Sequence, residues 1–148
     1  MTSWRFVVPL PPQGKQKTRH PSRRNAPLRE AVAFLAASTM PSEPLAGPLR
    51  VDLLSVSQRP KAMQRRRDPD GLLWCPQKPD KDNIEKLVYD AMRDRWDDDK
   101  QVVAGDTLTT YTAKTGDLSS PQLVVRVTRL GTLNDDGPTP LASSLGLL

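Results

Sequence analysis

Two aspartates, Asp80 and Asp82, stand two residues apart just before the main helical pattern of the chain. Carboxylates at this spacing can bind one hard cation together or flank a pair of cations. Magnesium suits such a site, because it accepts one or two protein carboxylates, keeps several waters and takes further ligands from substrate phosphate. A pair of such ions can activate water and stabilise the leaving oxygen of an in-line displacement. The two residues therefore indicate a magnesium site that acts on phosphodiesters.

Each residue of this region also has a structural interpretation. Asp82 suits the N-cap position of a helix, since Glu85 follows it three residues later. A cap needs only one acid, however, which leaves Asp80 unexplained. Lys86 lies four residues after Asp82 on the same helix face, where it can form an ion pair with Asp82 or Asp90. The alternative for Lys86 is a cation beside the scissile phosphate, where it offsets the charge that develops during attack.

A second acidic cluster, Asp97–Asp99, follows the predicted helix. It can be a solvated turn between the helix and the next strand, and it lacks the ligand spacing of a calcium-binding EF-hand loop. If the chain turns back beside the start of its own helix, one of these acids can instead complete the metal site. The sequence leaves both interpretations open.

Positive charge is concentrated in the first half of the chain. Residues 1–79 carry 14 Lys/Arg against 5 Asp/Glu, a net +9, and residues 80–148 carry 8 against 12, a net −4, which together give +5. A basic region of this kind is a feature of proteins that contact nucleic acid. The cations expected to contact DNA phosphates are Lys15, Lys17, Arg19, Lys61, Arg65, Arg66, Arg67 and Lys78.

The tryptophans have two interpretations. Trp74 can stack on a base at an opened crossover, and packing in the core or against a hairpin is the alternative. Trp4 and Trp96 are assigned to packing.

The remaining composition excludes several classes of protein. One Cys and one His leave no disulfide framework, no zinc cluster and no convincing Ser/His/Asp set for acyl transfer. No apolar run approaches the ~20 residues of a membrane span, and the N-terminus lacks the pattern of a signal peptide. We therefore expect a cytoplasmic protein.

Alternation and helical spacing predict the elements that position these residues. Strands are expected at 4–10, 49–57, 101–114 and 122–130, and helices from near Asn25 and from about Asp82 to Arg95. The segment 58–79 is predicted to be a long loop or irregular hairpin, which in a compact domain is usually functional or disordered. The chain is thus predicted to be one α/β or α+β domain, residues 1–130, with a small mixed sheet of about four strands and two main helices. Residues 131–148 are predicted to be a disordered tail.

Three sequence elements resemble the RusA family of Holliday-junction resolvases, which are small dimeric endodeoxyribonucleases of bacteria and phages. The first is the strand that ends in Pro-Leu-Pro-Pro at 9–12. The second is Lys-Pro-Asp-x-Asp-Asn-Ile-x-Lys at 78–86, continued by Asp-Ala-Met at 90–92. The third is Asp-Asp-x-Gln-Val-Val at 98–103, with Lys114 where the family often carries a lysine. The similarity covers residues 4–130 and is strong over 78–103.

The resemblance implies a magnesium-dependent homodimer with two active sites that nicks opposing strands of a four-way DNA junction, with Mn²⁺ able to replace Mg²⁺. By position, Asp80, Asp82 and Asp99 would bind the metal and Lys86 would be the catalytic lysine. Asp98 is the reserve candidate, because three consecutive acids blur the register. Such an enzyme would act in recombination and repair or in phage DNA processing, in the cytoplasm of a bacterium or of a phage-infected host. A nuclease for other branched DNA and a non-catalytic DNA-binding protein on the same scaffold are the alternatives.

Overall fold

The computed structural model describes residues 2–12 and 26–131 of the 148-residue chain. Its longer elements, in chain order, are β1 (Ser3–Val8), α2 (Ala26–Thr39), β2 (Leu49–Ser57), β3 (Leu73–Trp74), α3 (Lys81–Ala91), β4 (Val102–Ala104), β5 (Thr107–Tyr111) and β6 (Gln122–Arg129). Single 3-10 turns, η1 (Lys61–Met63), η2 (Arg93–Arg95) and η3 (Asp99–Gln101), lie in the connections.

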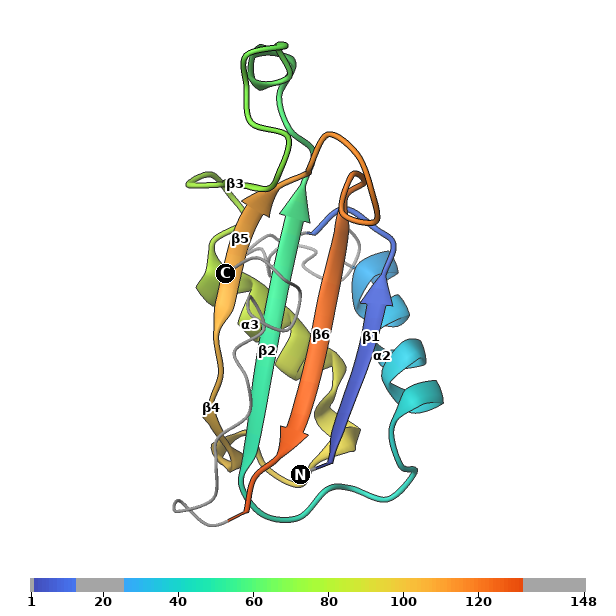
Figure 1. The fold of residues 1–148 in the computed structure, drawn as a ribbon. Helices are drawn as coiled ribbons and strands as arrows, with labels where there is room; N and C mark the ends of the chain where they lie inside the picture. Colours follow the sequence, from blue (N-terminus) through green and yellow to red (C-terminus); the bar gives the residue numbers. More distant parts are fainter. Residues whose placement is uncertain (1, 13–25, 132–148) are drawn as a thin grey trace.

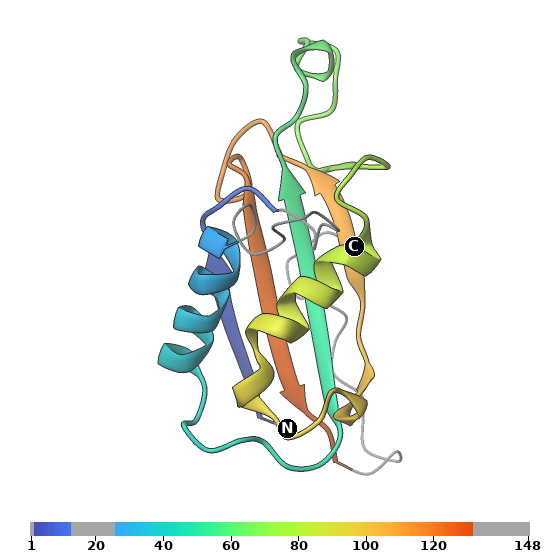
Figure 2. The same ribbon diagram turned by 180° about the vertical axis from the view of Figure 1, so that it is seen from behind.

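One mixed sheet contains all six of these strands (Figure 1). Its main path is β1-β6-β2-β5-β3, and the short β4 pairs with the start of β2. β6 runs antiparallel to β1 and β2, whereas β2 and β5 are parallel neighbours. Because adjacent parallel strands need a crossover connection, the chain between β2 and β5 must leave the sheet, and α3 lies in that crossover. α3 therefore starts near the β5 and β3 edge and crosses the sheet diagonally (Figure 2).

Both helices cover the same face of the sheet (Figure 2). The helix predicted from about Asp82 is α3, and its apolar side chains lie at helical spacing, since Ile84, Leu87 and Val88 are buried in the main core together with side chains of α2 and the sheet. The opposite face carries a smaller apolar cluster, formed by Leu54, Val56 and Val124 under Leu72, Leu108 and Leu118. The helices are thus fixed from one side by the core, and their other sides are left to carry polar groups.

The predicted fold class is confirmed, but the sheet has six strands instead of about four. The single strand expected at 101–114 is divided into β4 and β5 at Gly105, whose φ is 148°. A Cβ atom at this position would overlap the carbonyl oxygen of Val51, so the backbone passes β2 at a separation that only glycine allows. The other additional strand, β3, has two residues, which is too short to produce a recognisable alternation.

Two predicted segments fall outside the described residues. They are all of residues 13–25, which include the candidates Lys15, Lys17 and Arg19, and residues 132–148 of the predicted tail. Where the structure describes the chain, the strand predicted at 49–57 coincides with β2, and the helix predicted from Asn25 is α2. Among the described residues, no helix has the length and apolar character required to cross a bilayer.

Candidate active site

Helix α3 carries the acidic pair at its start. Asp80 is the N-cap residue, with φ −67° and ψ 151°, and its carbonyl oxygen accepts a hydrogen bond from the Ile84 N–H at 3.1 Å. The prediction that Asp82 is the cap is therefore wrong, because Asp82 lies inside the first turn. The backbone of Asp80 is extended, whereas that of Asp82 is helical. Both aspartates lie at the N-terminal end of a helix whose buried side fixes its position.

The carboxylates of this pair are accessible. Asp80 is exposed, and its side chain makes no capping hydrogen bond. The side chain of Asp82 is 71% exposed and forms an ion pair with Lys86 Nζ at 3.1 Å, and Lys86 itself is 57% exposed. The helix dipole favours negative charge at this end of α3. Two exposed carboxylates are a donor set that Mg²⁺ accepts, so these residues fit the implied metal.

The second acidic cluster forms a tight turn between α3 and β4. Asp98 caps η3, where its side chain accepts a hydrogen bond from the Lys100 N–H at 2.9 Å. Asp99 Oδ1 accepts a hydrogen bond from the indole Nε1–H of Trp96 at 3.0 Å, and Trp96 is buried. Both acids therefore form hydrogen bonds that stabilise this turn, which agrees with the interpretation of the cluster as a turn between the helix and the next strand.

Within one chain, the two acidic groups lie apart. Asp99 lies near Tyr89 in the second half of α3, where its charge contributes to the raised pKa of the phenol. Tyr89 follows Asp82 by seven residues, which corresponds to about 10 Å along a helix. Among the described residues, no three acidic, histidine or cysteine side chains come together in a way that could hold a metal ion. The expected meeting of Asp80, Asp82 and Asp99 thus does not occur in a single chain, because the first two lie at the start of α3 and Asp99 lies in η3, beyond its end.

Tyr89 lies on α3 between the acidic pair and the turn at 97–99. Burial, followed by the charges of Glu85 and Asp99, raises the pKa of Tyr89 to about 12. Its ring meets the ring of Trp96 edge to face, with a centroid separation of 6.3 Å. Glu85 accepts a hydrogen bond from the Thr107 hydroxyl at 2.6 Å, which ties α3 to β5. Sequence reasoning gave Glu85 no role beyond capping, although its position three residues after Asp82 places it on the same side of the helix.

Beyond the end of the sheet, residues 60–72 form a projecting arch that leads directly into β3 (Figure 1). At its base lies the side chain of Arg59, which is 2% exposed. The guanidinium donates to four backbone carbonyl oxygens at 2.5 to 3.2 Å, those of Met63, Pro69, Gly71 and Thr112. One side chain therefore joins both limbs of the arch to the end of β5. Sequence reasoning missed this residue, because no local pattern distinguishes Arg59 from the exposed arginines nearby.

A second cation, Lys114, holds the middle of the arch. Its ammonium donates to the carbonyl oxygens of Arg65 at 2.8 Å and Asp68 at 2.6 Å, and it lies 3.6 Å from the Asp70 carboxylate. The Asp68 carboxylate accepts a hydrogen bond from the Arg65 N–H at 2.7 Å, which is the largest cause of the lowered Asp68 pKa. The arch is therefore a folded element whose shape is set by internal hydrogen bonds.

The predicted DNA-binding cations of the arch face solvent. Lys61, Arg66 and Arg67 are exposed and, as far as the structure describes the chain, have no ion-pair partner. Arg65 is 54% exposed and pairs with Asp68 at 3.3 Å. Lys78, just before the acidic pair, is also exposed. The arch thus presents positive charge on a preformed backbone beyond the end of the sheet.

The tryptophans differ from one another in exposure. Trp96 is buried and Trp4 packs against the main core, as predicted. Trp74 is 71% exposed, so the interpretation that it packs in the core or against a hairpin is wrong.

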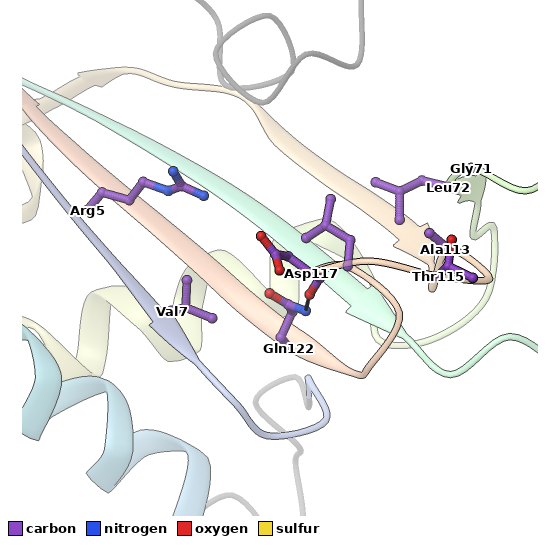
Figure 3. Close-up of a pocket in the computed structure, with 9 residues that line it drawn as sticks. Arg5, Val7, Gly71, Leu72, Ala113, Thr115, Asp117 and Gln122 are labelled. Carbon is purple, nitrogen blue, oxygen red and sulfur yellow. Dashed lines mark hydrogen bonds between the residues drawn. The ribbon is translucent and has the colours of Figure 1, made fainter.

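A separate hollow of about 550 Å³ lies on the sheet face opposite the helices (Figure 3). Arg5 and Val7 line it from β1, and Leu72, Leu118 and Gln122 line it from the other side. Asp117 is the one acid in its lining, so this hollow lacks the carboxylate pair that distinguishes the start of α3.

Comparison with known families identifies the class of protein to which the chain belongs. The model of the family endodeoxyribonuclease RusA matches residues 9–128, which is most of the 148-residue chain. A comparison with curated proteins gives no match. The matched range contains the start of α3, the turn at 97–99 and the whole arch. The chain therefore belongs to the RusA family of endodeoxyribonucleases.

Proposed function

We propose that this protein is a magnesium-dependent endonuclease that resolves four-way DNA junctions as a homodimer, with Mn²⁺ able to replace Mg²⁺. The observation that carries the proposal is the exposed carboxylate pair of Asp80 and Asp82 at the start of α3, with Lys86 3.1 Å from Asp82, in a chain of the RusA family. We further propose that it acts on recombination or repair intermediates, or in phage DNA processing, in the cytoplasm of a bacterial cell or of a phage-infected host.

Each residue of the pair region has a separate role in this proposal. Asp80 and Asp82 hold the divalent ions, which supply an activated water and charge stabilisation for in-line attack on phosphorus. Lys86 lies one turn further along α3, where its ammonium can move from Asp82 to the scissile phosphate and offset developing negative charge. Because both Lys86 and Asp82 are largely exposed, their ion pair is weak and exchange of partners requires little free energy.

The arch supplies the contacts to the DNA backbone. Lys61, Arg65, Arg66 and Arg67 stand on a fixed loop, and Lys78 lies close to the acidic pair in sequence. Each phosphate contact releases counterions and adds about 0.9 to the slope of log affinity against log salt concentration. Replacing Arg66 and Arg67 together with alanine should therefore lower that slope by about 2 and weaken binding to all DNA forms alike.

The homodimer gives Asp99 a role that a single chain does not allow. We propose that Asp99 of one protomer joins Asp80 and Asp82 of the other, so that each active site contains acids from both chains. Asp99 Oδ1 is occupied by Trp96, but a carboxylate has about four acceptor positions, and Asp99 Oδ2 can still bind an ion. Asp98, the reserve candidate, is the N-cap of η3 and pairs with Lys100 at 3.9 Å.

A mixture of two inactive variants tests this arrangement. Mixed dimers of Asp82→Asn and Asp99→Asn chains contain one intact site if each site is shared between protomers, and no intact site if each site lies within one chain. We expect the mixture to nick a synthetic four-way junction on one strand at a rate well above that of either variant alone. A mixture of demonstrated heterodimers that remains inactive contradicts the shared site.

The alternatives are separated by the substrate and the metal. Four-way junction, flap and linear duplex of equal length are incubated with the protein with and without Mg²⁺. We expect paired nicks in the four-way junction alone. Preferential cutting of the flap would favour the nuclease for other branched DNA, and tight junction binding by a folded dimer without nicks in Mg²⁺ or Mn²⁺ would favour the non-catalytic binding protein.

A further inference from the structure

The side chain of Trp74 exposes a large apolar surface on the short edge strand β3. Its side chain is 71% exposed, whereas Trp96 is 2% exposed and Trp4 is half-buried. Tryptophan is highly buried on average, and Trp74 lies between the basic arch and the acidic pair along the chain, so its exposed indole is a candidate contact for the DNA.

The backbone that carries Trp74 is held on both sides. Trp74 pairs with Thr110 of β5, and the next residue, Cys75, is buried. The Cys75 N–H donates to the Thr109 carbonyl oxygen at 3.0 Å, and the Thr109 hydroxyl donates to the Cys75 carbonyl oxygen at 3.0 Å. The indole therefore stands on a fixed edge of the sheet and not on a mobile loop tip.

The position of Trp74 connects the two proposed DNA contacts. It follows Gly71, at the end of the Arg59-bonded arch, by three residues, and it precedes Asp80 by six residues. A fully extended chain of six residues spans at most about 20 Å, so the indole and the acidic pair are within the reach of a short DNA segment. In Figure 1, β3 lies between the arch and the start of α3.

We propose that Trp74 stacks on a base that is unpaired at the branch point of the DNA, and so sets the preference for branched over linear duplex DNA. This inference rests on the proposed function, since the partner is branched DNA. Stacking is suited to this task because every base has an aromatic face, whereas paired bases inside a duplex offer theirs only to their neighbours. The exposed cations of the arch would hold the adjoining phosphates, and these contacts alone would not distinguish a branch from a duplex.

The test compares three substitutions at Trp74 with a matched control. Trp74→Phe keeps an aromatic ring, Trp74→Leu keeps apolar bulk, and Trp74→Ala removes both. Phe34 is the control, because it has the same 71% exposure but lies on α2, away from the arch. Thermal melts establish that all four variants are folded, which is expected for exposed side chains.

Binding is measured in EDTA, so that it does not depend on cleavage. The probes are a four-way junction with 2-aminopurine at the branch, the same junction with 2-aminopurine within an arm, and a linear duplex. We expect Trp74→Ala and Trp74→Leu to weaken junction binding about tenfold more than duplex binding, and Trp74→Phe and Phe34→Ala to retain most of the preference. Wild type and Trp74→Phe should change the fluorescence of the branch probe but not of the arm probe.

Three outcomes would overturn the inference. They are a junction preference that survives Trp74→Ala, equal binding by Trp74→Leu and wild type, and equal losses for junction and duplex. Junction cutting by wild-type protein in Mg²⁺ is scored separately. If wild type does not cut but shows the expected Trp74 dependence of binding, the proposed nuclease function fails while the stacking role stands.

Discussion

The start of α3 and the turn before β4 contain the same residue type in opposite situations. At the start of α3, the Asp80 and Asp82 side chains are exposed, and the ion pair to Lys86 joins two largely exposed groups. In the turn, Asp98 accepts a backbone N–H and Asp99 accepts the N–H of a buried indole. A carboxylate that accepts no hydrogen bond from the protein can bind a cation at little cost in free energy. A carboxylate that accepts a hydrogen bond from a buried donor must keep that bond or leave the donor unpaired.

The number of acids in a segment therefore does not by itself identify a metal site. Residues 80–99 contain seven aspartates, of which two lie on the intervening helix and turn, at positions 90 and 94, and five lie at positions 80, 82, 97, 98 and 99. Of these, only Asp80 and Asp82 combine exposure with the positive end of an α-helix. Substitutions that separate charge from hydrogen bonding can therefore distinguish the two regions.

The largest effect is expected at the start of α3. Asp82→Asn, or Asp80→Asn, should lower junction cutting at least about a hundredfold, because a group that positions charge in the transition state is lost. The unfolding free energy should change by less than about 0.5 kcal/mol, since surface substitutions of this kind rarely do more. Single-turnover cutting assays and thermal melts measure the two quantities. Loss of cutting that follows loss of folding would remove the distinction between the regions.

The second effect separates the two roles of Asp99. Asp99→Asn keeps an acceptor for the Trp96 indole, so stability should be nearly unchanged while cutting falls at least about tenfold from the lost charge. Asp99→Ala removes the acceptor as well and should cost about 1–3 kcal/mol of unfolding free energy. At roughly 2–4 °C per kcal/mol for a chain of this size, calorimetry will resolve the difference. Full cutting activity in Asp99→Asn would show that this acid is purely structural.

An intermediate effect is expected for Lys86. Lys86→Met should lower the rate of cutting about tenfold to a hundredfold, while Lys86→Arg, which keeps a cation, should retain more of it. The stability cost of losing the exposed ion pair to Asp82 should be below about 0.5 kcal/mol. Rates at saturating DNA distinguish this role from binding. If Lys86 served only as an ion-pair partner on the helix, the rate would be the same in all three proteins.

The smallest effect is a change in a pKa. The pKa of Tyr89 is raised from 10.0 to about 12, and Asp99 contributes to that shift after burial and Glu85. Asp99→Asn should therefore lower this pKa part of the way toward 10.0. Because the folded value exceeds the unfolded value, the contribution of neutral Tyr89 to stability is complete below pH 10 and is lost as the pH rises toward 12.

Ultraviolet titration measures this pKa in a Tyr111→Phe background, since the chain contains two tyrosines. An unchanged Tyr89 pKa in the Asp99→Asn protein would mean that Asp99 lies further from α3 than the structure places it.

Local sequence patterns predicted the elements well where one local force dominates. The alternation at 49–57 predicted β2, and the apolar stripe at Ile84, Leu87 and Val88 predicted the buried face of α3. The predicted end of that helix was too late, because α3 stops at Ala91 and a 3-10 turn replaces the last predicted turn. Boundaries depend on a few hydrogen bonds at the helix end, and these leave little trace in the pattern.

Contacts between residues that are far apart in the sequence leave no local sequence pattern from which they could be predicted. In the sequence, Arg59 cannot be told apart from the nearby arginines that are expected to contact DNA. In the structure its guanidinium is buried and donates hydrogen bonds to carbonyl oxygens from both limbs of the arch. Packing was one of the two interpretations of Trp74, yet this residue lies on the two-residue edge strand β3 and is exposed to solvent. The division of β4 from β5 at Gly105 depends on the approach of Val51 more than fifty residues earlier.

The sequence by itself determined the chemistry that this protein can offer: two adjacent carboxylates, a lysine one helical turn later and a run of arginines. These are consequences of covalent order and of helical spacing, which act over a few residues. Only the tertiary structure decided that Asp99 lies beyond the far half of α3 from Asp80 and Asp82, and that the arch is a folded element. Parallel pairing of β2 with β5 forces α3 to cross the sheet, so the two ends of that crossover are held apart by the length of the helix.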